Sequence, residues 1–310
     1  MRAELHPIPA RLNLAIATTQ VIALVTILVS AAYVSSWWAL LALALAYGLA
    51  MNSAYSMLHE AEHGVAHPRR RVNTTIGVVL ALFFPAPFHL LRQGHLGHHI
   101  RNRSDDEAFD LYFEGESPLW KHIQLFGILT GLYWCVVAFA NVVAAVWPSF
   151  FRPSNAKLST FDRPTAALWE TLNPRYLPWI RLEAIAAIVL HTTLVVTLEI
   201  PPLRYFAVLF GFGFLWSALQ YLHHFATERD VRRGARNLRS LRVVDLLLLH
   251  HNWHLRHHMY PTVPWIHLPD LERGADEPRG SVVLAYLAMW RGPRFSEERV
   301  RNHYAGRIIA

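Results

Sequence analysis

Two long uncharged segments lie near the start of the chain. They cover residues 12–34 and 37–58, and only Ser35 and Ser36 separate them. Each segment is long enough to cross a hydrocarbon layer about 30 Å thick as an α-helix, and the two-residue connection predicts a tight helical hairpin. The length of the first segment and the absence of a small-residue cleavage site argue against a removable signal peptide.

A second hairpin is predicted in the second half of the chain. Residues 178–198 are apolar except for Arg181 and Glu183 near the start, and residues 205–222 carry no charge. Two consecutive prolines between these segments favour a sharp turn. Both segments are therefore predicted to be transmembrane helices.

Two further apolar segments fit less well as straight spans. Residues 74–91 contain Pro85 and Pro87, which favour an interfacial or partly dipping helix over a full crossing. Residues 123–147 carry no charge and are long enough to cross. Whether they do so depends on which polar clusters must share one side of the membrane.

The composition is that of a membrane protein. Of the 310 residues, 53% are hydrophobic and only 16% are charged, unlike an ordinary soluble domain. We expect an all-α integral membrane protein formed by one domain, residues 1–310. It would have four transmembrane helices in two hairpins, interfacial helices at 74–91 and 123–147, and a cap formed by residues 59–121 and 223–310.

Basic residues dominate the charge of the chain. The formal net charge of +7 predicts an anionic partner surface, either lipid head groups or an acidic protein. Nucleic acid is a weaker interpretation, because the basic residues flank apolar spans and form no separate domain.

The distribution of arginines predicts the orientation. The outer turns carry only Arg204, whereas the other side holds arginines at 69–71, 101, 103 and throughout 229–242. The positive-inside rule therefore places the histidine-rich side in the cytoplasm, as in a bacterial inner membrane.

Histidine is the main candidate for metal binding. The single cysteine, Cys135, excludes multi-cysteine sites, and the chain has 19 histidines. The stretch HEAEH places His59 and His63 four residues apart, so they lie on one face and can bind one ion together if the helix of the second span continues through them. The alternative is a pair of surface histidines. A zinc protease motif with Glu60 as general base also matches, but it leaves the other clusters unexplained.

Two other stretches have the same HxxHH spacing. The residues concerned are His95, His98 and His99 in GHLGHH, and His254, His257 and His258 in HLRHH. Because consecutive helical side chains diverge by about 100°, each stretch can face two neighbouring ions. Together with HEAEH they offer eight nitrogen donors, more than one ion uses.

The end of the fourth predicted span adds a further candidate. In QYLHH, Gln220 and His224 lie four residues apart and face the same way on a helix. His224 is predicted as a ninth ligand, with Gln220 holding a metal-bound water. The alternative is that His223 or His224 forms a hydrogen bond at the interface.

A metal site shared by distant clusters constrains the topology. Residues 95–99 and 250–258 must lie on one side of the membrane, so an even number of crossings separates them. With 178–198 and 205–222 as a hairpin, residues 123–147 are predicted to lie in the interface, or to dip into the membrane and return.

The donor set also indicates which metal is bound. Many imidazoles without thiolate suit iron, copper or zinc, and structural zinc is saturated by four donors. Two ions with open positions beside an apolar interior predict oxygen chemistry, and hence iron. The free ring nitrogens need supporting groups. Five carboxylates are expected to provide this support: Asp105, Asp106, Asp110, Glu228 and Asp230. The alternative for most of them is a solvated run of charges. Asn252 and His250 are further candidates.

The three stretches HEAEH, HLGHH and HLRHH, in this order and separated by paired spans, resemble the histidine boxes of the membrane fatty acid desaturase and hydroxylase superfamily. The resemblance covers roughly residues 12–272. The stretches NWHLRHHMYPTVPWIHLPDL and TERDVRRGARNL are similar to those of acyl-lipid desaturases and their bacterial relatives.

This resemblance implies a di-iron centre (Fe2+/Fe3+) that uses O2 and two electrons to remove hydrogen from an unactivated C–H bond of a lipid or fatty acyl substrate. It implies that the eight box histidines are ligands. In some members an Asn and a further histidine at the end of the last span complete the site, and here Gln220 and His224 occupy this pattern. Glu60 stands where many relatives have Asp.

The chain carries no recognisable cytochrome b5 domain, flavin motif or iron–sulfur cysteines. The resemblance therefore implies an external electron donor of the ferredoxin or cytochrome b5 type, which the basic cap would attract.

Desaturation is favoured by the third box and the YPTVPW that follows it. A hydroxylase, a carotenoid ketolase and a terminal-alkene-forming fatty acid decarboxylase are alternatives, because sub-ångström placement of the substrate decides among them. A metal carrier is a remote alternative, since only His191 lies in mid-span.

Overall fold

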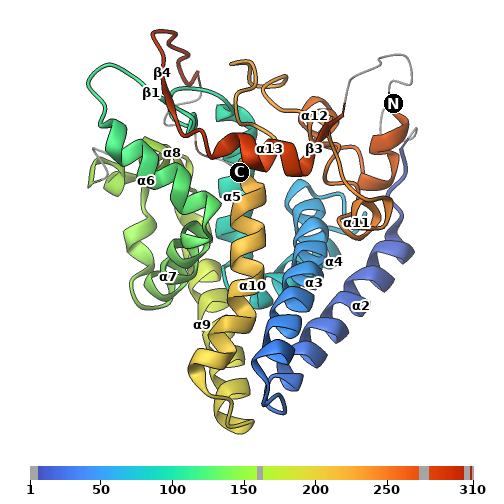
Figure 1. Ribbon diagram of the computed structural model, residues 1–310. Helices are drawn as coiled ribbons and strands as arrows, with labels where there is room; N and C mark the ends of the chain where they lie inside the picture. The colour runs from blue at the N-terminus through green and yellow to red at the C-terminus, as the bar shows by residue number, and fades with distance from the viewer. Residues whose placement is uncertain (1–5, 159–162, 272–278, 304–307, 309–310) are drawn as a thin grey trace.

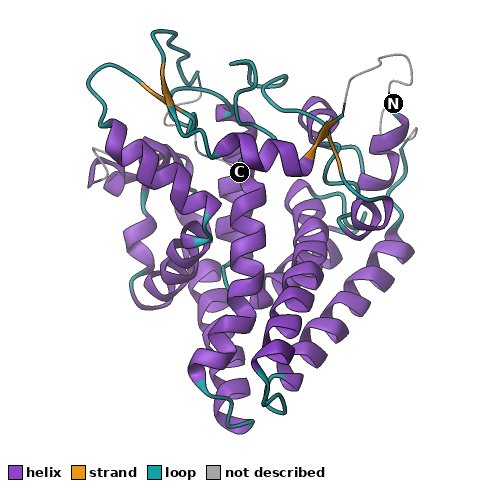
Figure 2. Cartoon of the chain, viewed as in Figure 1, coloured by secondary structure: helices purple, strands orange, loops and turns teal. Residues whose placement is uncertain are grey.

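The computed structural model describes residues 6–158, 163–271, 279–303 and 308, and most of them are helical (Figure 2). Within these ranges, four helices are long and apolar enough to cross a membrane: α2 (Ala10–Ser30), α3 (Trp37–His63), α9 (Leu177–Thr197) and α10 (Pro202–Gln220). The expected all-α fold with four spans is confirmed. Parts of the predicted cap, at 272–278, 304–307 and 309–310, lie outside the described residues.

The four spans form two hairpins. The turn from α2 to α3 and the turn from α9 to α10 lie at the same end of the bundle, opposite the cap (Figure 1). The hairpins meet where α3 crosses α10, and a methyl group added at Gly211 would overlap the backbone of Ala44. Small residues at this crossing bring the two backbones into contact, as is common between membrane helices.

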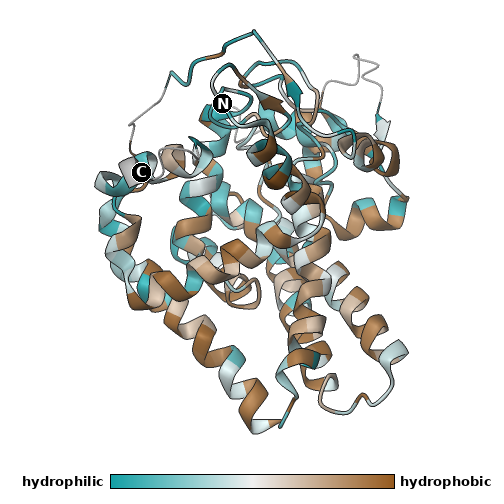
Figure 3. Cartoon of the chain, turned by 60° about the vertical axis from the view of Figure 1, so that its left-hand side comes forward, coloured by the Kyte–Doolittle hydropathy of each residue, from teal (hydrophilic) through white to brown (hydrophobic). Residues whose placement is uncertain are grey.

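The helices of the bundle consist mainly of apolar residues (Figure 3). Large side chains on the spans are exposed, with Ile22 63%, Leu45 52% and Val189 56% accessible. Exposed apolar side chains of this size on several neighbouring helices are suited to lipid rather than water. The chain is a multi-pass membrane protein.

Two pairs of shorter helices are sharply bent. The pair α4 (Arg70–Phe83) and α5 (Phe88–Arg101) bends by 102°, and the pair α6 (Pro118–Leu129) and α7 (Leu132–Val146) bends by 88°. Prolines lie in the first bend, and Gly131, with φ of 88°, lies in the second. Such bends are expected in segments that enter the membrane and return to the same side. The depth of both segments in the membrane stays a prediction.

The cap consists of short elements that surround the bundle end. The helices are α8 (Arg163–Thr171), α11 (Arg242–Leu247), α12 (His254–Met259) and α13 (Val282–Met289), with 3-10 turns η1 (Pro148–Phe151), η2 (Pro153–Leu158), η3 (Pro174–Tyr176) and η4 (Trp265–Asp270). Two parallel strand pairs join distant segments: β1 (Leu111–Tyr112) with β4 (Arg294–Phe295), and β2 (Leu238–Arg239) with β3 (Gly280–Ser281). These pairings attach the C-terminal part of the chain to the rest of the cap.

A buried polar network fixes the cap to the end of α10. The Asp110 carboxylate pairs with Arg103 at 2.5 Å, and it accepts hydrogen bonds from the Tyr221 hydroxyl (2.5 Å) and the Ala226 amide (2.7 Å). Arg103 and Asp110 are only 1% and 2% exposed. Because both charges are paired inside the protein, removing either one would leave the other buried and unpaired.

Candidate metal centre

The first histidine pair stands on a continuous helix. Helix α3 extends beyond the predicted end of the span and stops at Gly64, whose φ of 78° suits glycine at a helix C-terminus. His59 and His63 therefore project from the same face, with ring centroids 5.0 Å apart. The prediction for this pair required the helix of the second span to continue through HEAEH, and it does.

The other two clusters stand on short helices. His95, His98 and His99 lie in the last two turns of α5. Helix α12 begins at His254, and the Asn237 side chain caps its first turn by accepting the amide of Leu255 at 3.1 Å. One helical turn of HLRHH thus presents three imidazoles in a fixed orientation.

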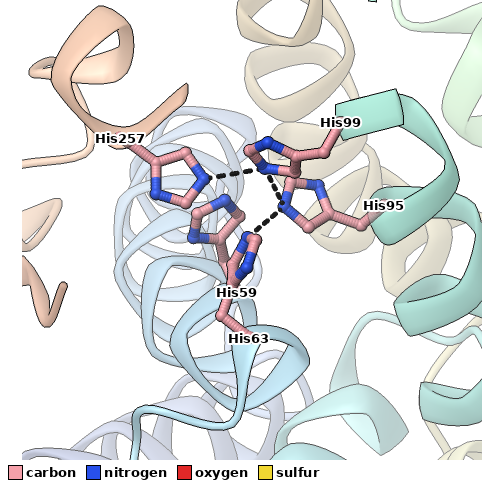
Figure 4. Close-up of side chains that lie close together, drawn as sticks. All are labelled: His59, His63, His95, His99 and His257. Atoms are coloured by element: carbon pink, nitrogen blue, oxygen red, sulfur yellow. Dashed lines mark hydrogen bonds between the residues drawn. The ribbon is translucent and has the colours of Figure 1, made fainter. Parts of the chain in front are cut away.

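Five rings converge in a first group. It consists of His59, His63, His95, His99 and His257 (Figure 4), each with one ring nitrogen within 4.8 Å of the others. The Nε2 atom of His95 lies 2.7 Å from that of His63 and 3.1 Å from that of His99. The Nε2 atoms of His99 and His257 are 2.9 Å apart.

Four rings form a second group beside the first. It consists of His98, His224, His254 and His258, with the same limit on nitrogen separation. The Nε2 atoms of His224 and His254 are 3.1 Å apart. The rings of His99 and His258 stack at 4.4 Å, so the two groups are in contact. The adjacent histidines of each HxxHH stretch fall in different groups, as the divergence of neighbouring helical side chains predicts.

The nitrogen geometry fits metal ions. Nitrogen ligands held about 2.1 Å from one ion at right angles are about 3 Å apart, close to the separations between these Nε2 atoms. A hydrogen-bond network is a poorer explanation, because a neutral imidazole nitrogen carries at most one proton and the Nε2 atoms of His95 and His99 each face two others.

The protonation state also fits metal binding. Burial lowers the pKa of His254, His257 and His258 well below the ordinary value, and the neighbouring imidazoles lower the pKa further. These rings are neutral at neutral pH, which is the form that binds metal. Both ring nitrogens of His258 and the Nδ1 of His254 are buried without a hydrogen-bond partner among the described residues. Unpaired buried nitrogens are costly unless a ligand occupies them.

A family comparison agrees with this geometry. The family model described as fatty acid desaturase matches residues 35–290, which include all the clustered histidines. The chain belongs to the fatty acid desaturase family. No curated protein sequence matches the chain. This membership and the two groups identify an enzyme with histidine clusters able to bind metal.

Neighbouring groups orient two of the rings in this desaturase family member. The Gly234 carbonyl oxygen lies 2.8 Å from Nδ1 of His224, which places the proton on Nδ1 and directs Nε2 to the group. The Glu107 carboxylate lies 2.7 Å from Nδ1 of His98. Burial opposes ionisation of Glu107, but Arg101 and His98 hold the pKa at about 2. Glu107 is therefore a charged acceptor at neutral pH.

The carboxylates predicted to support the rings bind other groups in the described structure. Asp105 binds Arg229 and Arg299, each at 2.6 Å, and Asp106 accepts a hydrogen bond from Asn302 at 3.1 Å. The side chain of Asp230 accepts the amides of Arg232 and Arg233. The structure does not bring these three carboxylates to the imidazoles. Glu107, missed by the sequence reasoning, takes this position.

Three other predicted supporting residues contact side chains outside the two ring groups. Asn252 donates to Asp245 at 2.9 Å and contacts His223. Gln220, at the end of α10, lies beside the Tyr55 hydroxyl. The ring of His250 packs on Trp265 at 5.7 Å. A water-mediated role for Gln220 stays a prediction.

His251 is a further histidine close to both groups, and it was not among the predicted site residues. Its ring centroid lies 4.9 Å from that of His59 and 5.0 Å from that of His254. Burial lowers the pKa of His251 to about 4. Together with His59 and His257 it lines a cavity of about 10 Å³, room for about one water-sized molecule. Its position in HHNWHLRHH is the only sequence feature that points to it. The residue spacing does not predict how far its ring lies from the two ring groups.

The contact between Glu107 and His98 makes a testable prediction. Glu107→Gln removes the charged acceptor of the Nδ1 proton, and substitutions of this kind weaken metal binding by about 10- to 100-fold. Iron affinity measured by competition with a chelator is expected to fall by this amount. Glu114→Gln, at an exposed position of the same segment, is the control. Equal iron affinity in the Glu107 variant and the control would refute the role of Glu107.

Proposed function

We propose that the protein is a di-iron enzyme that uses O2 to desaturate a fatty acyl chain in the membrane. The observation that carries this proposal is the pair of adjacent histidine groups, five and four rings, at one end of an apolar bundle. Nine imidazoles exceed what one ion binds. Imidazoles without thiolate suit iron, copper or zinc, and oxygen chemistry at two ions favours iron among them. Family membership supports fatty acyl oxidation.

The protein residues would hold and orient the metal. We assign the nine clustered histidines as ligands, with Glu107 and the Gly234 carbonyl fixing two of the rings. Two iron ions bound by these residues would supply the oxidation of an unactivated C–H bond by O2. The apolar bundle beside the groups would keep the acyl chain near the metals and exclude water.

The segment after the third box holds this box in place against the first two spans. Trp265, the last residue of YPTVPW, donates its backbone N–H to Glu60 at 2.9 Å and its indole N–H to Asn13 at 3.0 Å. These bonds tie the third box to α3 and α2. Glu60 is thus engaged in a structural bond, which disfavours its role as the general base of a zinc protease.

The charge of the cap supports the proposed orientation and the proposed type of electron donor. The exposed arginines of the cap side, including Arg232, Arg233 and Arg239, support a cytoplasmic location of the metal groups. They also suit an acidic electron donor of the ferredoxin or cytochrome b5 type, because complementary charge accelerates encounter.

Product analysis tests the proposed reaction. Lipids are extracted from cells that express the protein together with a ferredoxin and its reductase, and analysed by mass spectrometry against cells with an empty vector. We expect acyl chains that have lost two hydrogen atoms. Chains that have instead gained one oxygen atom would assign a hydroxylase, and unchanged lipids with full iron loading would contradict oxidation of an acyl lipid.

A further inference from the structure

A second cavity lies outside the histidine groups, between the start of α4, helix α5 and the start of α9. Its volume is about 210 Å³, many times the roughly 10–15 Å³ that one water needs. We call it the basic cavity. The residues of its wall that matter here are His67, Arg70, Phe88, His89, Arg92 and Tyr176.

The wall of the basic cavity offers hydrogen-bond donors. The Arg92 Nε donates to the Glu62 carbonyl at 3.0 Å, and within the described residues its two terminal nitrogens remain for a ligand. His67 accepts the amide of Arg69 through Nδ1 at 3.0 Å, so the neutral ring carries its proton on Nε2 and donates from there. Arg70 is exposed at the rim.

The charge of the basic cavity is unbalanced. None of the described residues that line it is Asp or Glu. The carboxylate of Glu183, on α9, is already bound to Nδ1 of His89 at 2.5 Å and to the His89 amide at 3.1 Å. Glu62 also lies near enough to Arg92 to interact with its charge, but no ion pair joins Arg70 or Arg92 to a carboxylate within the described residues. Two guanidinium groups of this kind form a site suited to a carboxylate or phosphate, which they can bind through paired hydrogen bonds.

We expect the basic cavity to lie at the depth of lipid head groups. Tyr176 and Trp179 stand at the start of the α9 span, and Trp179 is 56% exposed. Aromatic residues in this position mark the boundary between hydrocarbon and water. Phe88 supplies an apolar wall beside the arginines. A ligand that fits has a negative group and an attached apolar chain.

We propose that the basic cavity binds the negatively charged head group of an acyl lipid taken from the surrounding leaflet. Arg92 precedes His95 by three residues on α5, about 5 Å along the helix. A head group held there would place its acyl chain beside the histidine groups. The identification of the bound lipid as substrate rests on the proposed function, whereas the binding itself does not.

A matched pair of variants tests the binding. Arg70 and Arg71 are adjacent, exposed and equally charged, but only Arg70 lines the cavity. Binding of phosphatidylglycerol and phosphatidylcholine to the purified full-length protein is measured by native mass spectrometry. The wild type and Arg71→Glu are expected to retain phosphatidylglycerol preferentially, and Arg70→Glu to lose about tenfold or more of that preference, since charge-assisted bonds are lost and repulsion is added.

Three results would overturn the proposal. Equal loss in both variants would mean that the lipid responds only to overall surface charge. Equal retention of phosphatidylcholine and phosphatidylglycerol by the wild type would exclude an anion site. Displacement of the lipid by millimolar inorganic phosphate would assign a site for free anions. None of these readouts needs turnover, so they stand apart from failure of the proposed oxidation.

Discussion

Alanine at His257 or at His98 is expected to abolish turnover. Each substitution removes one ring from a different group, His257 from the first and His98 from the second. Because the groups are in contact through stacked rings, loss of either ion would disable the pair. Activity is expected to fall below about one hundredth of the wild type, in keeping with the large losses caused by removing members of a catalytic unit.

Membrane insertion is expected to be unaffected in these variants, since neither residue lies in one of the four spans. Iron bound per chain, measured by elemental analysis, should fall in both. His303→Ala, at an exposed position of the cap, is the control and should retain activity and iron. Full turnover in either the His98 or the His257 variant would overturn the ligand assignment.

Asp110→Asn is expected to cause the largest loss of stability. Asp110 binds Arg103, the Tyr221 hydroxyl and the Ala226 amide. The substitution leaves the Arg103 guanidinium buried with no anionic partner, and breaking a buried pair in this way costs about 3–5 kcal/mol. Thermal unfolding in detergent should occur at a markedly lower temperature, with loss of the cap from the end of α10.

Asp106→Asn provides the comparison for this variant. Asp106 is on the same segment and binds the Asn302 side chain at 3.1 Å, so its loss is expected to change stability by no more than about 0.5 kcal/mol. Replacing both Arg103 and Asp110 by leucine removes both charges and should recover part of the loss. Equal unfolding temperatures for Asp110→Asn and Asp106→Asn would contradict the role of the network.

The spans could be predicted from sequence because lipid imposes a simple requirement. A largely apolar run of about 20 residues can cross the lipid as a helix, which satisfies every backbone group internally. All four predicted runs are helices of the required length. The ends are less well determined. Helix α3 continues from the predicted end at residue 58 to His63, because the polar residues of HEAEH are buried inside the cap instead of marking a boundary.

The bend within residues 123–147 could not be located from sequence. In the first bent pair, the prolines at 85 and 87 indicated a break. In the second, the break falls at Gly131, where φ is 88° and a side chain would meet the backbone of Phe214 on α10. A glycine among apolar residues gives no such signal, since the need for it arises from packing against Phe214, 83 residues further along the chain.

The ring groups were predictable and their supporting residues were not. Histidines three or four residues apart lie close together on the same helix. The relative positions of the rings within HEAEH and within each HxxHH stretch therefore follow from the sequence. Acceptors for the other ring nitrogens depend on tertiary contacts. Asp105 was an equally plausible acceptor by position, but Arg229 and Arg299 from the C-terminal part bind it, and Glu107, two residues further on, reaches His98 instead.

The metal content of the purified protein tests the central claim most directly. The protein is expressed with iron in excess, purified anaerobically, and measured for iron, zinc and copper per chain, with Mössbauer spectroscopy to detect coupling between ions. Two groups of five and four rings in contact predict two coupled iron ions per chain. A single ion per chain, or stoichiometric zinc in place of iron, would contradict the account.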